Sequence, residues 1–150
     1  MSRRYSIDGA QAVGSPTVSV LGLTGATTIR PEIYDIIFGS TATPADNALQ
    51  WILRRYTAAG TGTTVTPQAL DPADPAALAT AKENHTGGEP TYTSNSVLLN
   101  ISANQRSTQR WVAAPGGELK IPATANNGIG VEPIHSSFTG SVEVTIHYAE

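Results

Sequence analysis

Apolar and polar residues alternate over short runs along most of the chain, which is the pattern of β-strands with one buried and one solvated face. The clearest run ends the chain, where Val142, Val144, Ile146 and Tyr148 alternate with polar side chains. Further strand-like runs lie at residues 3–8, 16–22, 33–38, 51–56, 92–102, 105–113, 119–121 and 129–133. Turn signals rich in glycine, proline and asparagine separate these runs. The pattern predicts an all-β fold of about eight to ten short strands, a sandwich or a barrel.

The stretch 30–56 organises this pattern. Two runs rich in β-branched and aromatic residues, Ile33–Phe38 and Trp51–Tyr56, flank the small polar segment Ser40–Asn47. We expect a strand–loop–strand unit here. In the first run both alternating sets carry apolar residues. A strand that is apolar on both faces is covered on both, so we expect a second sheet or a neighbouring subunit over each face.

In the second run the tryptophan and Leu53 fall on one face, while Gln50, Ile52, Arg54 and Tyr56 fall on the other. Arginine beside tryptophan and tyrosine is the composition of protein interface anchors, and also of platforms for sugars or nucleic acid. Alternatively, both tryptophans belong to the core and the arginines only solvate strand edges. The candidate interface residues are Trp51, Arg54, Arg55, Tyr56, Arg106, Arg110 and Trp111.

One segment, residues 70–83, has a helical pattern. Asp74 is a suitable N-cap, Pro75 suits the first helical position, and Ala76–Lys82 propagate a helix well. We therefore expect one short helix of two to three turns, packed on a sheet because it would be marginal alone. The long excursion Thr57–Thr91 between strands is unlike a simple meander and favours a jelly-roll-like β-sandwich.

The composition indicates a single domain spanning residues 1–150. Charged residues make up 14% of the chain, against roughly 25% in average soluble domains. Either small-residue loops or a surface covered in an assembly would explain this shortage. The net charge of -3 predicts no general attraction to nucleic acid. We expect a soluble protein without a membrane segment or signal peptide, in which Gly9–Ser15 is a flexible connector and residues 1–15 could form an N-terminal arm.

The side chains that could carry chemistry are scattered. His85, His135 and His147 are far apart in sequence and lack metal-ligand spacing. Asp71 and Asp74 could be paired acid–base carboxylates, but each precedes a proline, which is typical of a turn followed by a helix start. The chain has no cysteine, no phosphate-binding glycine loop and no nucleophile elbow. We therefore expect no enzyme, with no catalytic residue, metal or cofactor.

Several segments together resemble a group of small proteins encoded among the structural genes of tailed bacteriophages. The resemblance covers roughly Tyr5 to Tyr148. The segments that carry it are Arg30–Ser40, Ala42–Ala48, Arg54 or Arg55 before Tyr56, Pro67–Ala77 and Arg110–Leu119.

Phage proteins of this size with a jelly-roll-like build often serve as capsid decoration, or cement, proteins. The resemblance therefore implies a non-enzymatic virion protein, made in the bacterial host cytoplasm, that binds the major capsid protein on the capsid exterior as a homotrimer. It implies no nucleic-acid or membrane partner. Two other functions stay open: another virion component, such as a head fibre base, neck or tail protein, and a carbohydrate-binding β-sandwich that uses Trp51 or Trp111 as a stacking platform.

Overall fold

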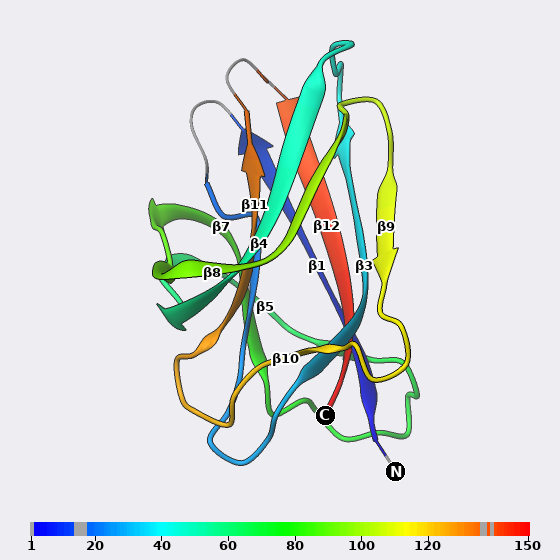
Figure 1. The fold of residues 1–150 in the computed structure, drawn as a ribbon. Helices are drawn as coiled ribbons and strands as arrows, with labels where there is room; N and C mark the ends of the chain where they lie inside the picture. The colour runs from blue at the N-terminus through cyan, green and yellow to red at the C-terminus, as the bar shows by residue number, and fades with distance from the viewer. Residues whose placement is uncertain (1, 14–17, 136–137, 139) are drawn as a thin grey trace.

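The computed structural model describes residues 2–13, 18–135, 138 and 140–150. Within these ranges the chain forms strands in two antiparallel sheets that pack face to face, and no helix (Figure 1). The all-β prediction is confirmed, and the arrangement is consistent with a β-sandwich. The strands are β1 (Arg4–Val13), β2 (Leu21–Thr24), β3 (Glu32–Thr41), β4 (Ala48–Ala58), β5 (Thr61–Val65), β6 (Gln68–Ala69), β7 (Thr80–Gly88), β8 (Thr91–Asn104), β9 (Gln109–Val112), β10 (Leu119–Lys120), β11 (Gly128–Ile134) and β12 (Gly140–Ala149).

Consecutive strands often lie in opposite sheets. Sheet A has the order β10-β3-β12-β1-β6, with β9 also paired to β3, and sheet B has the order β5-β7-β2-β11-β4-β8. The chain changes sheet at every step except those from β4 to β5, from β7 to β8 and from β9 to β10. The two central runs of the sequence therefore form β3 and β4 as expected, but these strands face each other across the core and do not pair.

The core fills the space between the sheets. Trp51 of β4 packs against Phe38 of β3, with ring centroids 5.1 Å apart, and Tyr5 stacks on Tyr148 at 5.5 Å. The alternation predicted for the last strand is confirmed, because its four apolar residues are all buried. The largest fully buried side chains are Trp51, Tyr5, Tyr56, Tyr148, Phe38, Ile7, Leu21, Leu23, Ile33, Ile36, Leu49 and Leu53.

A β-bulge in β3 explains why this strand looks apolar on both faces. The register with β12 shifts between the pairs His147–Asp35 and Tyr148–Ile33, which leaves Tyr34 as an extra residue. Such an insertion changes which alternating set faces the core. Apolar residues on both sides of the bulge are consequently buried in one core, namely Ile33, Ile36 and Phe38. Within the described chain a second sheet covers only the inner face of β3, while the outer face carries the buried Asp35 and half-buried side chains. Cover of this outer face by a neighbouring subunit stays a prediction.

The predicted helix over residues 70–83 is also wrong. Asp71 closes a turn, since its Oδ1 accepts a hydrogen bond from the backbone N–H two residues later, at 2.9 Å. The carboxylate of Glu150 accepts hydrogen bonds from the backbone N–H groups of Leu78 and Ala79. From Thr80 onward the chain pairs with β2 on one side and β5 on the other. Two strand partners outweigh the helix propensity of alanine, because a helix of two to three turns is marginal.

The expected N-terminal arm is a strand over most of its length. β1 pairs with β12 from Arg4–Ala149 to Val13–Gly140 without a shift in register. The flexible connector expected at Gly9–Ser15 is therefore wrong for residues 9–13. Residues 14 and 15 lie outside the described residues.

One charged side chain crosses the gap between the sheets on each side of the sandwich. Glu83 of β7 accepts a hydrogen bond from the backbone N–H of Ala10 in β1, at 2.9 Å. On the other side, Arg55 of β4 donates from Nη1 to the carbonyl oxygen of Lys120 in β10, at 2.7 Å. Each contact links the strand next to an edge of sheet B to the backbone of sheet A.

Candidate functional site

The outer face of sheet B has a floor of glycines on which two tyrosine rings lie. Gly128 and Gly130 of β11 pair with Tyr56 and Arg54 of β4. A Cβ atom added to Gly128 would lie 2.3 Å from Cζ of Tyr56, and one added to Gly130 would lie 2.2 Å from the hydroxyl of Tyr92. Only glycine leaves room for aromatic rings this close to the backbone. Tyr56 is 2% exposed on this face.

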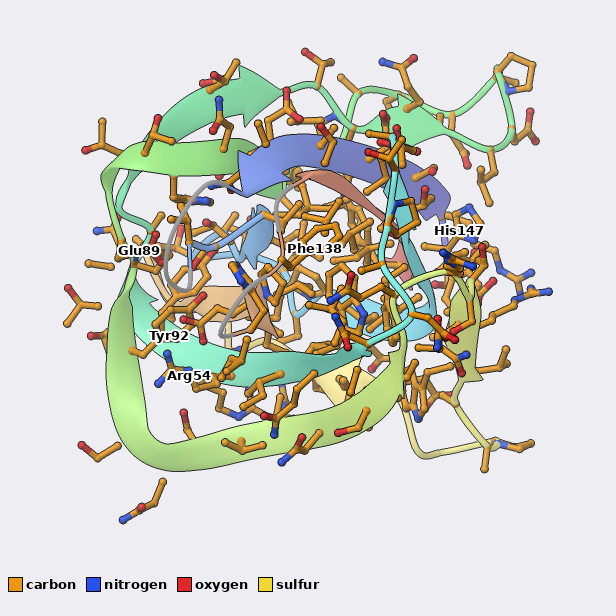
Figure 2. All side chains as sticks on the ribbon, turned by 90° about the horizontal axis from the view of Figure 1, so that it is seen from above. Arg54, Glu89, Tyr92, Phe138 and His147 are labelled. Atoms are coloured by element: carbon orange, nitrogen blue, oxygen red, sulfur yellow. The ribbon has the colours of Figure 1, made fainter. Side chains whose placement is uncertain are left out.

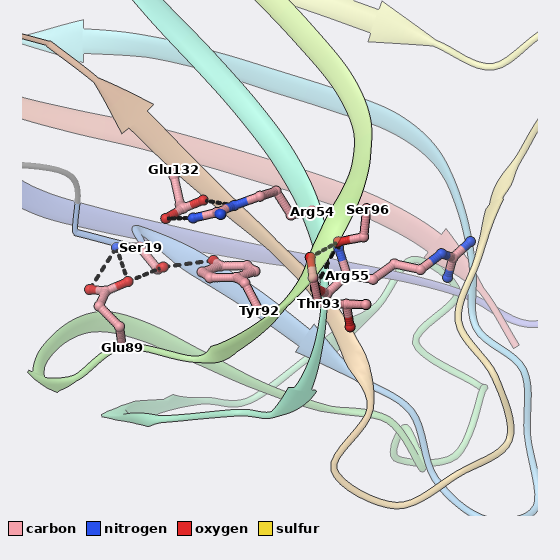
Figure 3. Close-up of polar contacts among 8 residues, drawn as sticks. All are labelled: Ser19, Arg54, Arg55, Glu89, Tyr92, Thr93, Ser96 and Glu132. Carbon is pink, nitrogen blue, oxygen red and sulfur yellow. Dashed lines mark hydrogen bonds and ion pairs between the residues drawn. The ribbon is translucent and has the colours of Figure 1, made fainter.

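Arg54 and Glu132 form a part-buried ion pair beside the ring of Tyr92 (Figure 3). The guanidinium of Arg54 makes two hydrogen bonds to the carboxylate of Glu132, one of them 2.6 Å between Nη2 and Oε1. Its central carbon lies 4.1 Å from the ring centroid of Tyr92, within range of a cation–π interaction. This geometry holds the start of β8, where Tyr92 lies, onto β4 and β11.

Glu89 fastens the turn between β7 and β8 to the chain ahead of β2. Both oxygens of its carboxylate accept hydrogen bonds from the backbone N–H of Ser19, at 3.1 Å, and one also accepts from the Ser19 hydroxyl. The same hydroxyl lies 2.7 Å from that of Tyr92. We call the set Ser19, Tyr56, Glu89, Tyr92, Arg54 and Glu132 the sheet B cluster.

Burial controls the protonation of the sheet B cluster. It raises the pKa of Tyr56 and of Tyr92 well above the ordinary phenol value, so both stay neutral. Burial also raises the pKa of Glu132, although the hydrogen bonds from Arg54 act in the opposite direction. The hydrogen bond to Glu132 in turn raises the pKa of Arg54. The ion pair is therefore fixed in place at an electrostatic cost and supplies no accessible acid or base.

A second cluster lies on the outer face of sheet A, at the bulge in β3. Asp35 accepts two hydrogen bonds from Arg110 of β9, at 2.9 Å from Nε and 2.7 Å from Nη2, and its Oδ2 lies 3.2 Å from Nδ1 of His147. Tyr34 stacks on His147, and Arg4 lies over the Tyr34 ring at 5.5 Å. Because the bulge turns neighbouring residues of β3 to the same face, these five residues meet. We call them the Asp35 cluster.

The carboxylate of this cluster is buried, but its partners are not. Hydrogen bonds from Arg110 hold the pKa of Asp35 below its ordinary value, with a further contribution from His147, although burial acts in the opposite direction. The side chain of Arg110 is 61% exposed and that of His147 is 26% exposed. The ring of His147 contacts both Asp35 and Tyr34. Figure 2 places His147 on the opposite side of the sandwich from Arg54, Glu89 and Tyr92.

The other two histidines are held by the backbone. Nδ1 of His85 lies 3.0 Å from the carbonyl oxygen of Ser19, and Nδ1 of His135 accepts a hydrogen bond from the backbone N–H of Phe138 at 3.1 Å. Burial lowers the pKa of His135. Among the described residues, no three histidine or acidic side chains gather in a way that could hold a metal ion.

The structure does not bring the seven predicted interface residues together. Trp51 and Tyr56 are buried, and Trp111 is half-buried against the core. Core placement was the alternative that the sequence left open for the tryptophans. Arg106 is exposed, and its Nε bonds the carbonyl oxygen of Pro44 at 3.2 Å. Because β4 belongs to sheet B and β9 to sheet A, the residues on these two strands lie in separate regions.

Sequence reasoning missed the acidic partners in both clusters. Glu132 gives a weak signal, because it shares a face with Gly128 and Gly130 in an otherwise apolar strand. Asp35 gives another, as a single charge inside an apolar run. A lone carboxylate in such a context is rarely buried without a cationic partner. That argument predicts an arginine nearby, but it does not identify Arg54 or Arg110.

Comparisons with protein-family models, with curated proteins and with solved structures find no match to this chain. Across the residues that the structure describes, no helix has the length and apolar character needed to cross a membrane. Neither cluster combines a free nucleophile with a poised base in a recess, which is the usual geometry of a catalytic site.

Proposed function

We propose that this protein is a jelly-roll virion component of a tailed bacteriophage. In this proposal it binds the outside of the capsid as a homotrimer and stabilises the shell as a decoration, or cement, protein. Its partner is the major capsid protein, and it works by burying surface between capsid subunits, without catalysis.

The observation that carries the proposal is the strand order. With the excursion β5–β7 set aside, the remaining strands form the sheets β1-β12-β3-β9 and β2-β11-β4-β8. The chain alternates between these sheets except at the step from β4 to β8, and β10 extends the edge position of β9. This is the order expected of a jelly roll, an architecture shared by viral capsid proteins and lectins.

Two features of the sequence support a structural function. The chain resembles small structural proteins of tailed phages over roughly Tyr5 to Tyr148. Its charged fraction of 14% is also low, as expected if part of the surface is covered in an assembly. The exposed Arg106 and Arg110 are the predicted interface residues most available to a partner.

Copy number in purified particles of the phage that encodes the chain tests the proposal. Quantitative mass spectrometry against the major capsid protein should give a ratio near one to one, or another simple fraction repeated over the whole shell. Light scattering on the purified protein should give the mass of three chains. A handful of copies would contradict decoration and favour a neck, tail or fibre protein.

Absence from particles would contradict both virion functions and leave the carbohydrate-binding alternative. That alternative has lost one of its two stacking rings, since Trp51 is 2% exposed and packs on Phe38. Only Trp111 would remain, and it is half-buried against the core. A glycan-induced shift in tryptophan fluorescence would then have to come from Trp111.

A further inference from the structure

We propose that the free edge of β8 between Val97 and Asn104 receives an extended strand of the capsid protein. The inference rests on the proposed function and names the contact through which decoration would occur. Strand addition of this kind uses backbone hydrogen bonds for affinity and alternate side chains for specificity.

The β8 edge offers a regular row of backbone donors and acceptors. From Ala48–Asn104 to Leu53–Leu99 the pairing of β4 with β8 has no shift in register. The same register continues to Gln105, whose N–H donates to the carbonyl oxygen of Asn47 at 2.9 Å. Because the direction of N–H groups alternates along an antiparallel strand, those of Leu99 and Ile101 point to β4. The N–H groups of Leu98, Asn100 and Ser102 therefore point away from the sheet.

This edge lacks the protection that other edges of the described fold have. Proteins protect edge strands by keeping them short, by placing charges on them, or by covering them. β6, β9 and β10 are short, and the latter two carry Arg110 and Lys120. β5 has five residues and a shifted register, and Glu83 caps the edge of β1 at Ala10. β8 has 14 residues, and none of them is charged.

The side chains of β8 also indicate what kind of strand would fit. Leu99 and Ile101 pair with core residues of β4, yet both are only half-buried, and Val97 is 49% exposed. Asn100 and Ser102 alternate with them on the outer face. A matching strand would be uncharged, with apolar residues beside Leu99 and Ile101 and polar residues on the other face. Such a strand would cover the exposed parts of Val97, Leu99 and Ile101.

A second copy of this chain is the competing occupant of the β8 edge. Two β8 edges that pair about a two-fold axis would use both edges in a closed dimer. A three-fold trimer instead leaves three such edges available, one for each capsid subunit around a three-fold position. If the protein is the homotrimer of the proposed function, this symmetry favours the capsid strand over a second copy.

The test measures binding of the purified protein to shells of the encoding phage prepared without this protein. Ser102→Pro removes an outward-facing N–H and leaves the bonds to β4 intact, and Ser102→Lys adds a charge to the edge. Each variant should bind at least about tenfold more weakly than the wild type. Thr64→Lys places the same charge on the exposed edge strand β5 and should bind like the wild type.

Hydrogen exchange gives a second readout that does not depend on substitution. The amides of Asn100 and Ser102 should exchange fast in the free protein and become protected on the shell, whereas those of Leu99 and Ile101 should be protected in both. Wild-type binding that the Ser102 variants retain would overturn this inference alone. Failure of the wild type to bind would overturn the proposed function as well. Loss of a dimer in light scattering of Ser102→Lys would identify a second copy as the occupant and also overturn the inference.

Discussion

The two outer faces of the sandwich carry an arginine–carboxylate pair each, but they are completed in different ways. On sheet B the chain covers its own face, because the turn from β7 into β8 brings Tyr92 over Gly130 and is fastened by Glu89 to Ser19. Glu132 is 3% exposed beneath it. On sheet A the carboxylate of Asp35 is also buried, but its arginine is open to solvent, with Arg110 61% exposed against 33% for Arg54.

The pKa values of the two carboxylates are shifted in opposite directions. Burial raises the pKa of Glu132, because lost hydration outweighs what Arg54 returns. At Asp35 the hydrogen bonds from Arg110 dominate and lower the pKa. In the covered pair, loss of hydration disfavours the ionised carboxylate despite its arginine. In the open pair, the arginine favours the ionised carboxylate. The arginine on sheet B is thus partly covered by the chain, whereas the arginine on sheet A is mostly exposed.

The largest expected effect comes from filling the glycine floor. Gly128→Ala places a Cβ atom 2.3 Å from both Tyr56 and the carbonyl oxygen of Leu23. Because the backbone cannot move far in a central strand, the variant should lose about 3 kcal/mol of unfolding free energy. Urea denaturation followed by tyrosine and tryptophan fluorescence measures this loss.

Gly39→Ala is the matched control on the outer face of sheet A. The nearest atom to its added Cβ is Oγ1 of Thr108, at 3.3 Å. The hydroxyl of Thr108 can move, so the loss of unfolding free energy should stay below about 1 kcal/mol. Equal losses in the two variants would contradict the distinction between a covered and an open face.

Removing the cation of the covered ion pair should have an effect of similar size. Arg54→Leu leaves the carboxylate of Glu132 buried without a partner, and such losses cost about 3 kcal/mol. The double variant Arg54→Leu/Glu132→Leu should recover most of this, because no unpaired charge remains. Equilibrium denaturation of the single and double variants gives the comparison.

Arg106→Leu is the control for this substitution, since Arg106 is exposed and contacts only a carbonyl oxygen. It should change stability little. A double variant that is no more stable than Arg54→Leu would show that packing of the arginine side chain on Tyr92, and not the ion pair, holds β8 in place.

Asp35 and Glu132 should change the pH dependence of stability in opposite directions. The folded-state pKa of Asp35 lies below its unfolded value. Its contribution is therefore fully present above the unfolded value of about 4 and is lost as the pH falls through the folded pKa. Asp35→Asn should flatten the stability profile in this acid range. Glu132→Gln should not, because a raised pKa gives a slope of opposite sign. Thermal melts between neutral pH and the acid limit of folding measure both slopes.

Sequence patterns predicted the elements better than their partners. The alternation at Val142–Tyr148 identified a half-buried strand because period-two patterns record burial directly. The alanine run after Asp74 misled because local propensity is weak against two strand partners. The apolar faces of β3 misled for another reason, since a bulge changes the period within one strand and leaves no sequence signal of its own.

The partners within the candidate sites could not be predicted either, because they are far apart in the chain. Arg54 and Arg110 were recognised as unusual from their aromatic neighbours, but their acids lie 78 and 75 positions away in the chain. Only the strand order brings such residues together. The sequence shows that residues 91–104 carry no charged side chain, but it could not indicate that they form an edge strand.

The smallest expected effect is a change in the pKa of Asp35 itself. Arg110→Leu removes the hydrogen bonds that lower this pKa most, so burial should then dominate and the pKa should rise. Stability at neutral pH should fall less than in Arg54→Leu, because the guanidinium of Arg110 is largely hydrated in the folded protein and His147 still contacts the carboxylate. Carboxyl ¹³C chemical shifts followed through an acid titration report the pKa directly, with Arg106→Leu as the control that should leave it unchanged. An unaltered Asp35 titration in Arg110→Leu would mean that the open face does not hold this arginine in place, and the contrast with the covered pair would then rest on Arg54 alone.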